Sequence, residues 1–415
     1  MLGLADCNNF FVSCERSVNP SLEGKPVVVL SNNDGCVVAR SNESKCLGIR
    51  MGCPAFEIRE LVDSGSVIAL SGNHLLYREI SLRVHDIFRR FAPATLDYSV
   101  DEAFLDMSGV PEGELLAIGE AIYDACWDEE HIPVTIGFAP TKTMAKIATE
   151  VSKKSNVRVR LLPDAESAMP YYEKLPAGEL WGIGRRLGKK MSQCGVYTIA
   201  DLYHRNQSWV RSEFGVNLER SWLELHGVSC IELTHVERLL QDSISESRTF
   251  PDDVDDYDYI RARIVIYASD CARKLRAMGG ECLEVGVFLR SNPFHPERCM
   301  LRPEGKVLLP HPSSDTTLIT GAALTVLDDI YEEGALFKRA GVWLNRISEA
   351  KIPAPSLFGE ETSDSAQMKR FMQTIDRINA DVGKQNIGLA SRIVKGQQGH
   401  NDGYSSSFQA PNKNK

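Results

Sequence analysis

The sequence lacks several features that would place it in other protein classes. No apolar run reaches the roughly 20 residues that a membrane-spanning helix needs. The first residues carry neither a basic segment nor the apolar stretch of a secretion signal. The 11 cysteines are scattered along the chain, and none forms a Cys-x-x-Cys pair. These absences favour a cytoplasmic protein without membrane segments, a disulfide framework or a zinc site.

Positive charge is also scarce. The 47 Lys and Arg residues are outnumbered by 56 Asp and Glu residues, which gives a formal net charge of −9. A nucleic-acid-binding protein of this composition has to gather its cations locally and place its acids elsewhere. Apolar residues are plentiful, at 43% of 415 residues. The length is enough for several hydrophobic cores and indicates two to four domains.

The stretch 95–106 contains the first candidate site. Two apolar, strand-like runs flank a tight link, which ends in the adjacent acids Asp101 and Glu102. Adjacent carboxylates repel each other and are costly to desolvate, so they are not expected to be buried together without a cation. A hairpin would lift both out of the sheet, and their hard oxygen atoms suit Mg²⁺. The alternative is a solvated acidic turn, which is the commoner meaning of such a pair taken alone.

A third carboxylate follows another apolar run. Residues Leu2 to Ala5 are apolar and lead directly into Asp6, a pattern that predicts a buried strand with a carboxylate at its end. Further on, strand-like and helix-like segments mix, with the hairpin at their centre. This order predicts an α+β domain with helices on one face of its sheet.

Residues 141–154 have a helical pattern with two different faces. At 100° per residue, Lys142, Lys146 and Lys153 fall within about 40° of one another. The opposite side is apolar and is expected to pack on the sheet. The lysine side presents three ammonium groups, either to carboxylates and phosphates or simply to solvent.

A cationic segment with two glycines follows, between two predicted helices. The glycine spacing does not match a dinucleotide-binding fingerprint. A Gly-Ile-Gly link at a helix start exposes backbone N–H groups that can bind phosphate. A helix-hairpin-helix that holds a DNA backbone therefore fits better than a plain turn. Its DNA-binding residues would be Gly182, Gly184, Arg185, Arg186, Lys189 and Lys190.

From about residue 243 the pattern starts anew. The order of expected elements is β-α-β-β-α-β, which predicts a separate ferredoxin-like domain. A polar, Pro-rich tail begins near residue 351, and its last part, 396–415, is expected to be disordered. The six expected elements are strand 244–249, helix 257–278, strands 282–290 and 299–309, helix 316–333 and strand 337–346.

Three segments in the first half of the chain together resemble the Y-family translesion DNA polymerases. They are Ala5–Phe11, Lys25–Arg40 and Tyr98–Ala103, and the Ser31–Val37 and Trp181–Arg186 runs point to the UmuC branch, the catalytic subunits of bacterial DNA polymerase V. The resemblance implies a right-hand polymerase with a ferredoxin-like palm, small fingers and a helical thumb. The implied divisions are palm 1–18 and 75–162, fingers 19–74, thumb 163–232, linker 233–242, little finger 243–350 and tail 351–415.

The resemblance also implies the chemistry of the site. Nucleotidyl transfer in this family uses two Mg²⁺ ions, and the matching catalytic residues are Asp6, Asp101 and Glu102, assisted as metal ligands by the Cys7 carbonyl. The implied nucleotide-binding residues are Lys153, Arg40 and Lys45 for the triphosphate and Phe11 as a steric gate against ribose, next to Phe10, which is expected to pack in the core. The family commonly has Tyr and Arg where this chain has Asn42 and Lys45.

The implied function is error-prone synthesis on damaged DNA in the SOS response, with no segment left for a proofreading exonuclease. Two alternatives stay open: a two-metal nuclease, and a non-catalytic DNA-binding subunit. The implied partners are primer-template DNA, dNTPs, a UmuD′-type dimer, a RecA filament and a sliding clamp, in the cytoplasm and at the nucleoid during activity. A weak clamp peptide without the usual Gln would consist of Ala354, Pro355, Ser356, Leu357 and Phe358.

Overall fold

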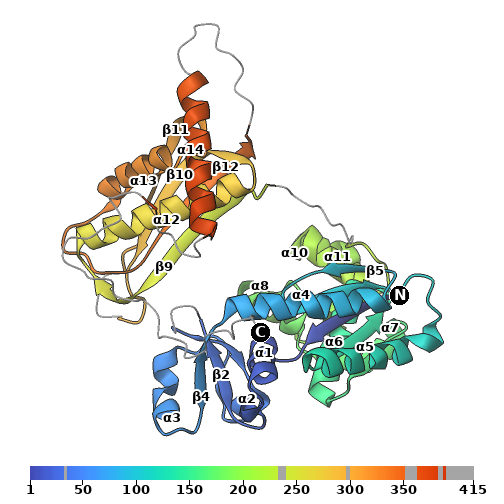
Figure 1. Cartoon of the computed structure of the whole chain (residues 1–415). Coiled ribbons are helices and arrows are strands. Elements are labelled where there is room, and N and C mark those ends of the chain that lie inside the picture. The colour runs from blue at the N-terminus through green and yellow to red at the C-terminus, as the bar shows by residue number, and fades with distance from the viewer. Residues whose placement is uncertain (32–34, 232–239, 296–299, 351–361, 382–386, 389–415) are drawn as a thin grey trace. The chain divides into compact units, whose positions relative to one another are not determined.

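The structure is a computed structural model that describes residues 1–31, 35–231, 240–295, 300–350, 362–381 and 387–388. The chain divides into two compact units, Met1–His235 and Val236–Lys415 (Figure 1). Each unit combines helices with sheet, so the predicted α+β multidomain fold is confirmed. The predicted clamp peptide and the segment 396–415 lie outside the described residues, as does most of the predicted linker.

A five-stranded sheet forms the centre of the first unit. Its order is β5-β6-β1-β7-β8. The central strand β1 pairs antiparallel with both β6 and β7 and is buried along most of its length, as its apolar sequence predicts. The strands are β1 (Leu2–Cys7), β5 (Ala94–Asp97), β6 (Glu102–Asp106), β7 (Val134–Ala139) and β8 (Val159–Leu161).

Helices cover both faces of this sheet, so the prediction of helices on one face is wrong. Ala5 belongs to the core formed with α4 and α5, whereas its neighbour Leu4 belongs to the core formed with α6. Successive strand residues point to opposite faces, and β1 is apolar on both, so each face needs a cover. The helices of this region are α1 (Phe10–Val18), α4 (His74–Phe91), α5 (Leu115–Glu130) and α6 (Lys142–Ser155), with a 3₁₀ turn at Glu112–Glu114.

The predicted fingers segment has its own small core. A three-stranded sheet of order β3-β2-β4 forms with α2 and α3 the blue lobe at the lower left of Figure 1. The core residues are Val28, Val37, Ile49, Cys53, Ile58 and Val67. The elements are β2 (Val27–Leu30), β3 (Val37–Arg40), α2 (Asn42–Cys46), α3 (Arg59–Asp63) and β4 (Ile68–Ser71), with 3₁₀ turns at Pro20–Leu22 and Ala55–Ile58.

The predicted thumb is a group of short helices that packs on α6. Its core is continuous with the α6 face of the central sheet. The fully buried Glu224 accepts hydrogen bonds from Thr143 N–H at 2.8 Å and Thr143 Oγ1 at 2.6 Å, so a thumb carboxylate caps the start of α6. The helices are α7 (Ala165–Tyr172), α8 (Arg185–Gln193), α9 (Ile199–Tyr203), α10 (Gln207–Phe214) and α11 (Val216–Leu225), with a 3₁₀ turn at Ala177–Glu179.

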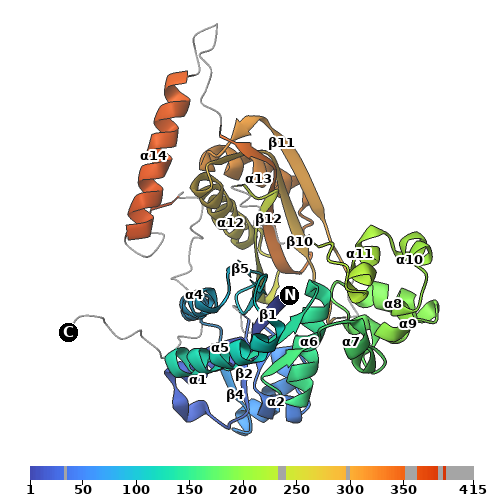
Figure 2. The same cartoon turned by 90° about the vertical axis from the view of Figure 1, so that its right-hand side faces the viewer.

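The second unit has the predicted β-α-β-β-α-β succession. Its sheet is antiparallel throughout, in the order β11-β10-β12-β9. Helices α12 and α13 lie side by side on one face (Figure 2). A further helix, α14 (Thr362–Asp381), is bound to α12 by the bidentate ion pair of Arg276 with Asp376. The other elements are β9 (Ser243–Val254), α12 (Tyr257–Ala277), β10 (Gly280–Arg290), β11 (Glu304–Ser313), α13 (Thr316–Ile330) and β12 (Phe337–Glu349).

One acidic side chain, Glu284, lies within this second sheet. It accepts hydrogen bonds from Lys306 Nζ at 3.0 Å and Asn345 Nδ2 at 3.4 Å, and Arg346 Nε is 3.9 Å away. The hydrogen bond from Lys306 holds the pKa of Glu284 below its usual value. The Glu284 carboxylate therefore has hydrogen-bond partners for both of its oxygens.

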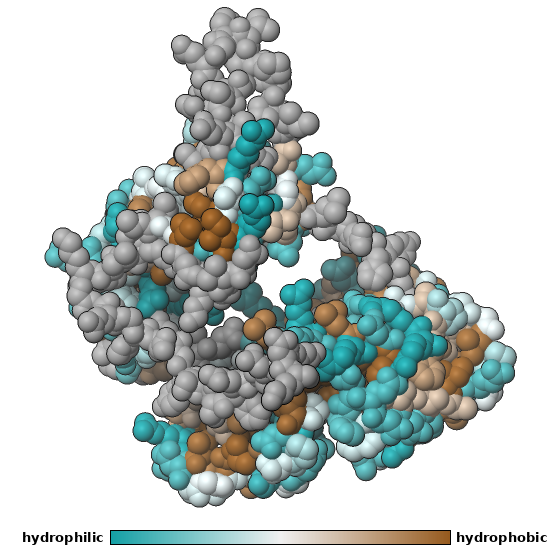
Figure 3. Space-filling view, in the orientation of Figure 1, coloured by the Kyte–Doolittle hydropathy of each residue, from teal (hydrophilic) through white to brown (hydrophobic). Residues whose placement is uncertain are grey.

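Hydrophilic residues cover much of the visible face of the first unit, interrupted by smaller hydrophobic patches (Figure 3). Among the described residues, no helix combines the length and apolar character needed to cross a membrane. The ten described cysteines are all free thiols.

Candidate active site

Two neighbouring strands bring two of the predicted carboxylates together. Asp6 lies near the end of β1 and Glu102 begins β6, and the two are partners across the antiparallel ladder. The Asp6 residue is only 8% exposed. Directly opposed residues have Cβ atoms about 4.5–5.5 Å apart, so the two acidic side chains share a small volume.

Asp101, the third predicted carboxylate, points to its own turn. Its Oδ1 accepts a hydrogen bond from Ser99 Oγ at 2.6 Å, and its backbone carbonyl accepts one from the Cys7 N–H at 2.8 Å. Within the part of the chain that the structure describes, no three His, Cys, Asp or Glu side chains form a ready-made metal-ligand cluster. The structure thus joins Asp6 to Glu102 and ties the Asp101 turn to β1 through the backbone.

Two lysines of α6 reach the paired carboxylates. Lys153 Nζ lies 2.5 Å from Asp6 Oδ1. Lys146 Nζ lies 3.2 Å from Glu102 Oε1 and 3.1 Å from Oε2. Both side chains come from the face that the helical periodicity predicts to be cationic.

Lys142 does not belong to this cationic face, and its prediction as an exposed ammonium group is wrong. The residue is only 3% exposed, and its Nζ lies 5.6 Å from the centroid of the Phe104 ring. The thumb covers the first turn of α6 through Glu224, which binds the neighbouring Thr143. Sequence periodicity cannot anticipate this, because the covering helix is some 80 residues away in the chain.

The surroundings of Asp6 shift its pKa strongly. Burial raises the pKa of Asp6 to about 7, the nearby Lys153 opposes the rise, and the hydrogen bond with Glu102 adds to it. The charged form of Asp6 is disfavoured by burial beside a second carboxylate, and a bound cation would favour it. Carboxylate oxygens are the ligands that Mg²⁺ prefers, so the residues present fit a divalent metal ion.

The Cys7 side chain is a core group. The residue is 2% exposed, and burial raises the pKa of its thiol well above the usual value. A neutral buried thiol is a poor ligand for a hard cation. Only the backbone carbonyl that the sequence assigned to metal binding stays a candidate.

The two predicted aromatic residues are placed differently. Phe10 is 3% exposed and packs in the core, as expected. Phe11 is partly buried, and its ring stacks on Tyr77 with centroids 4.4 Å apart and planes 17° from parallel. Tyr77 is held in turn by a hydrogen bond from its OH to Glu15 Oε1 at 2.6 Å. No sequence signal pointed to Tyr77, because the contact joins α1 to α4.

The fingers bring a further lysine to the site. Burial lowers the pKa of Lys45, and the positive charges of Arg40 and Lys153 add to the lowering. Arg40 Nη1 donates to the Ile49 carbonyl at 2.6 Å, which commits part of its guanidinium to the fingers. Arg40 is thus a weaker candidate for phosphate binding than Lys45.

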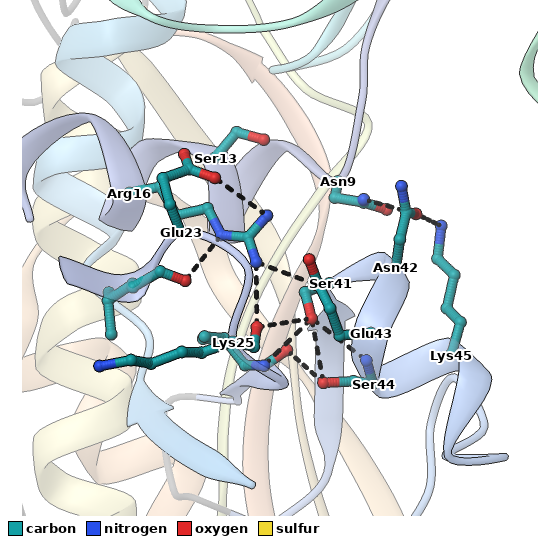
Figure 4. A network of polar contacts seen from close by, with 12 residues as sticks. Asn9, Ser13, Arg16, Glu23, Lys25, Ser41, Asn42, Glu43, Ser44 and Lys45 are labelled. Carbon is teal, nitrogen blue, oxygen red and sulfur yellow. Dashed lines mark hydrogen bonds and ion pairs between the residues drawn. The ribbon is translucent and has the colours of Figure 1, made fainter. Parts of the chain in front are cut away.

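Asn42, which stands where the family commonly has Tyr, links the predicted fingers segment to the start of α1. Its Oδ1 accepts hydrogen bonds from Asn9 Nδ2 at 3.0 Å and Lys45 Nζ at 3.3 Å (Figure 4). Nearby, Arg16 of α1 pairs with Glu43 of α2 at 2.9 Å. These polar contacts orient Lys45 relative to α1.

The cationic loop of the thumb begins α8. Gly182 has a φ of +86°, a conformation that favours glycine, and Gly184 is the residue immediately before α8. Arg185, Arg186, Lys189 and Lys190 are exposed. Lys190 is engaged with Glu213, whose carboxylate lies 3.6 Å away. The element before the loop is a 3₁₀ turn and not the full helix that the sequence predicts.

Comparison with known proteins covers nearly the whole chain. Residues 5–150 match the model of the impB/mucB/samB family, and residues 241–357 match the model of the C-terminal domain of that family. Protein ImpB of Salmonella typhimurium is 35% identical over 401 residues, which are 94% of this chain and 93% of that protein. Protein UmuC of Salmonella typhimurium strain LT2 is 34% identical over 96% of this chain and 94% of its own.

More distant matches agree. DNA polymerase IV of Moorella thermoacetica is 28% identical over 86% of this chain and 88% of its own. The structure of a Y-family DNA polymerase chimera of Dbh and Dpo4 matches with a TM-score of 0.66 and 22% identity, over 84% of this chain and 99% of that chain. At this identity the structural likeness concerns the fold. The family models and the relatives above 30% identity place the protein: the chain belongs to the impB/mucB/samB family, in the UmuC branch of the Y-family translesion DNA polymerases.

Proposed function

We propose that this chain extends a DNA primer across damaged template bases, with Asp6, Asp101 and Glu102 as the carboxylates of its catalytic site. The observation that carries the proposal is the cross-strand pair of Asp6 and Glu102, each joined by a lysine of α6. The relatives named UmuC and DNA polymerase IV support an error-prone DNA-directed DNA polymerase.

The proposed cofactor is two Mg²⁺ ions. Polymerases of this family generally depend on divalent metal ions. Asp6, Asp101, Glu102 and the Cys7 carbonyl would hold the ions. When bound, they supply positive charge to the phosphoryl groups and lower the barrier to nucleotidyl transfer. The raised pKa of Asp6 supports this assignment, because burial beside Glu102 disfavours the charged form of Asp6, which a bound cation would favour.

The cations around the carboxylates would bind the triphosphate. Lys153 lies on Asp6, and Lys45 is close to Lys153. A lysine ammonium is a compact point charge without the bidentate fork of Arg. Asn42 offsets part of this loss of geometric definition, because its side-chain carbonyl accepts a hydrogen bond from Lys45 and orients it. Arg40 would contribute mainly by its charge.

Phe11 is proposed as the steric gate against ribonucleotides. Its stacking on Tyr77 fixes the ring in one orientation, which a gate requires. Phe11→Ala is expected to raise ribonucleotide incorporation roughly tenfold or more relative to deoxynucleotide incorporation. Phe11→Tyr keeps the ring and serves as the matched control. Unchanged sugar selectivity in Phe11→Ala would refute the gate.

DNA would be held by the backbone N–H groups of the Gly182–Gly184 loop and by the exposed cations of α8. Such contacts bind phosphates and carry no sequence information. Arg186→Ala should therefore weaken DNA binding about equally on all sequences and reduce its salt dependence. The palm, fingers, thumb and little-finger divisions belong to the same proposal, supported by the separate core of the fingers segment.

Further partners are proposed from the relatives. The names UmuC and ImpB are consistent with a UmuD′-type dimer and a RecA filament in the SOS response. A sliding clamp would bind residues 354–358, which lie outside the described residues. Work in the cytoplasm, at the nucleoid during activity, is part of the same proposal.

Primer extension tests the function directly. The purified chain, with dNTPs and Mg²⁺, should extend a labelled primer opposite an abasic site. Asp101→Asn should lose this activity while its thermal unfolding stays close to that of the wild type. Strand cleavage in place of extension would favour a two-metal nuclease, and DNA binding without either reaction would favour a non-catalytic subunit.

A further inference from the structure

Lys146 occupies a site formed by aromatic side chains. Its Nζ lies 4.7 Å from the centroid of the Tyr98 ring and 5.5 Å from that of the Trp181 ring. The same ammonium group contacts both oxygens of Glu102. A lysine between two aromatic rings and a carboxylate is held in one position by cation–π attraction and by hydrogen bonds.

The two rings are also bound to each other. Trp181 Nε1–H donates a hydrogen bond to Tyr98 OH at 3.1 Å, and the ring planes are 85° apart. Tyr98 packs edge-on against Phe104, with centroids 5.5 Å apart. Tyr98 and Phe104 flank the turn that carries Asp101 and Glu102 in the sequence. The centroid of the Trp181 ring also lies 6.1 Å from that of the Phe104 ring, so the indole contacts a residue on each side of this turn.

Trp181 connects this cluster to the proposed DNA-binding loop. It directly precedes Gly182, whose φ of +86° makes the backbone depend on glycine at that position. A phosphate bound to the N–H groups of this loop would act on the backbone segment that carries the indole ring. The indole contacts the Lys146 ammonium, and the ammonium contacts Glu102.

Lys154, on the same helix, has a different setting. Lys154 pairs with Glu150 at 3.5 Å and with Glu179 at 2.5 Å on the surface, where its side chain is 46% exposed. The Lys146 and Glu102 side chains are each 18% exposed. Partial burial makes the charge pair stronger and its geometry more defined than a surface pair.

We propose that Lys146 is a positioning residue through which DNA bound at the Gly182–Gly184 loop orders Glu102, with Trp181 and Tyr98 as the connecting side chains. The inference rests on the proposed function, because it assigns DNA to the loop and catalysis to Glu102. It adds a connection between the two sites that neither assignment contains.

Single-turnover nucleotide incorporation tests the role of the lysine. Lys146→Met is expected to lower the maximal rate about tenfold or more, with less than a twofold change in the dissociation constant for DNA. Lys146→Arg should recover part of the rate. Lys154→Met is the matched control and should leave the rate unchanged. A Lys146→Met variant with the wild-type maximal rate would overturn the proposal.

The thumb side of the connection is tested in the same way. Trp181→Leu should lower the maximal rate in the same direction as Lys146→Met, and Trp181→Phe less, because it keeps a ring and loses only the N–H donor. Trp209, which packs on Phe214 with centroids 5.6 Å apart, provides the control variant Trp209→Phe. Equal rates for Trp181→Leu and the wild type would remove the indole from the connection.

Fluorescence gives a readout that does not depend on catalysis. The emission of Trp181 is the difference between wild-type and Trp181→Phe protein. A primer-template with a dideoxy-terminated primer should change this emission, and Mg²⁺ should then cause a second change that is absent in Glu102→Gln. No response of Trp181 to DNA would overturn the connection. If the emission responds but the wild type incorporates no nucleotide, only the proposed polymerase activity fails.

Discussion

Among the described residues, the main sheet of each unit contains one buried acidic residue, and the pKa values of these two residues are shifted in opposite directions. Asp6 in β1 is 8% exposed and Glu284 in β10 is 5% exposed. Asp6 faces a second carboxylate, and burial raises its pKa to about 7. Glu284 meets Lys306, Asn345 and Arg346, and the hydrogen bond from Lys306 lowers its pKa.

The difference shows which property marks a functional carboxylate. Asp6 and Glu284 both lie in strands and both have small exposed fractions, so a low exposed fraction in a strand does not by itself identify a site. The distinguishing property is the direction of the pKa shift: Asp6 is buried opposite a second carboxylate and its pKa is raised, whereas the pKa of Glu284 is lowered, and a raised pKa in such a pair marks a candidate functional site. Glu284 stabilises its own fold, whereas Asp6 and Glu102 are the carboxylates that we propose bind the metal ions.

The largest contrast is expected in catalysis. Asp6→Asn should lower the rate of single-nucleotide incorporation by about a thousandfold or more, because several kcal/mol of charge stabilisation are lost. Glu284→Gln should stay within twofold of the wild type. Rates measured under single-turnover conditions compare the two. Similar losses in both variants would remove the distinction between the two acids.

The second-largest difference is expected between variants of the two lysines that contact these acids, Lys153 and Lys306. Lys153→Met should reduce incorporation about a hundredfold, because a preorganised positive charge near the phosphates is lost. Lys306→Met should keep the rate and lower the unfolding temperature slightly, since Glu284 loses its nearest cation. Incorporation kinetics and thermal unfolding of both variants test this pair. A normal rate in Lys153→Met would remove that lysine from the site.

Magnesium should stabilise the folded protein by binding at Asp6 and Glu102, and this effect should not depend on Glu284. At about 100 times the dissociation constant, a ligand that binds the folded state adds about 2.7 kcal/mol, or roughly 5 °C in unfolding temperature for a unit of this size. The shift should be present in Glu284→Gln and largely absent in Asp6→Asn. Thermal unfolding with Mg²⁺ and with EDTA measures it. An equal shift in all three proteins would place the bound ion elsewhere.

The smallest effect concerns pH. The pKa of Asp6 is raised from 3.8 to about 7, so the folded state binds a proton more tightly, and stability falls as pH rises through this window. Glu284 has the opposite sign: its contribution is present above about 4.5 and is lost as pH falls through its lowered pKa. Asp6→Asn should therefore gain unfolding temperature relative to the wild type between pH 5 and pH 8.

We expect this gain to be roughly one or two degrees, because Asp6, Glu102 and Lys153 titrate as a coupled group. Thermal unfolding in EDTA across this pH range measures it. Glu284→Gln should show a deficit at neutral pH that shrinks in acid. If Asp6→Asn and the wild type have parallel profiles, Asp6 does not titrate as we infer.

Much of the fold could be predicted from local patterns. The apolar run before Asp6, the hairpin that carries Glu102 and the two-faced helix with Lys153 all have regular periodicities, and all three elements are present. The element order of the second unit was predictable for the same reason. The presence of helices on both faces of the first sheet could not be predicted, because short apolar strands have the same pattern whether one or both faces are covered.

The contacts that complete the candidate site could not be predicted. Phe11 meets Tyr77 from another helix, and Trp181 meets Tyr98 from a segment 83 residues away. Such pairs leave no periodic signal in the sequence. The prediction for Lys142 is wrong for the same reason. Helical periodicity indicates which residues share a face, but it does not indicate what covers that face.

Glu224 has a consequence for motion. Because it satisfies the Thr143 amide, a rigid-body separation of α11 from α6 would leave a buried carboxylate and a helix N-terminus without partners. The palm and α11 should therefore move as one body, and any closing of the thumb on DNA should be confined to the segment around α8. Amide hydrogen exchange reports this directly: Thr143 should exchange only by wide opening of the unit, and the α8 amides much sooner.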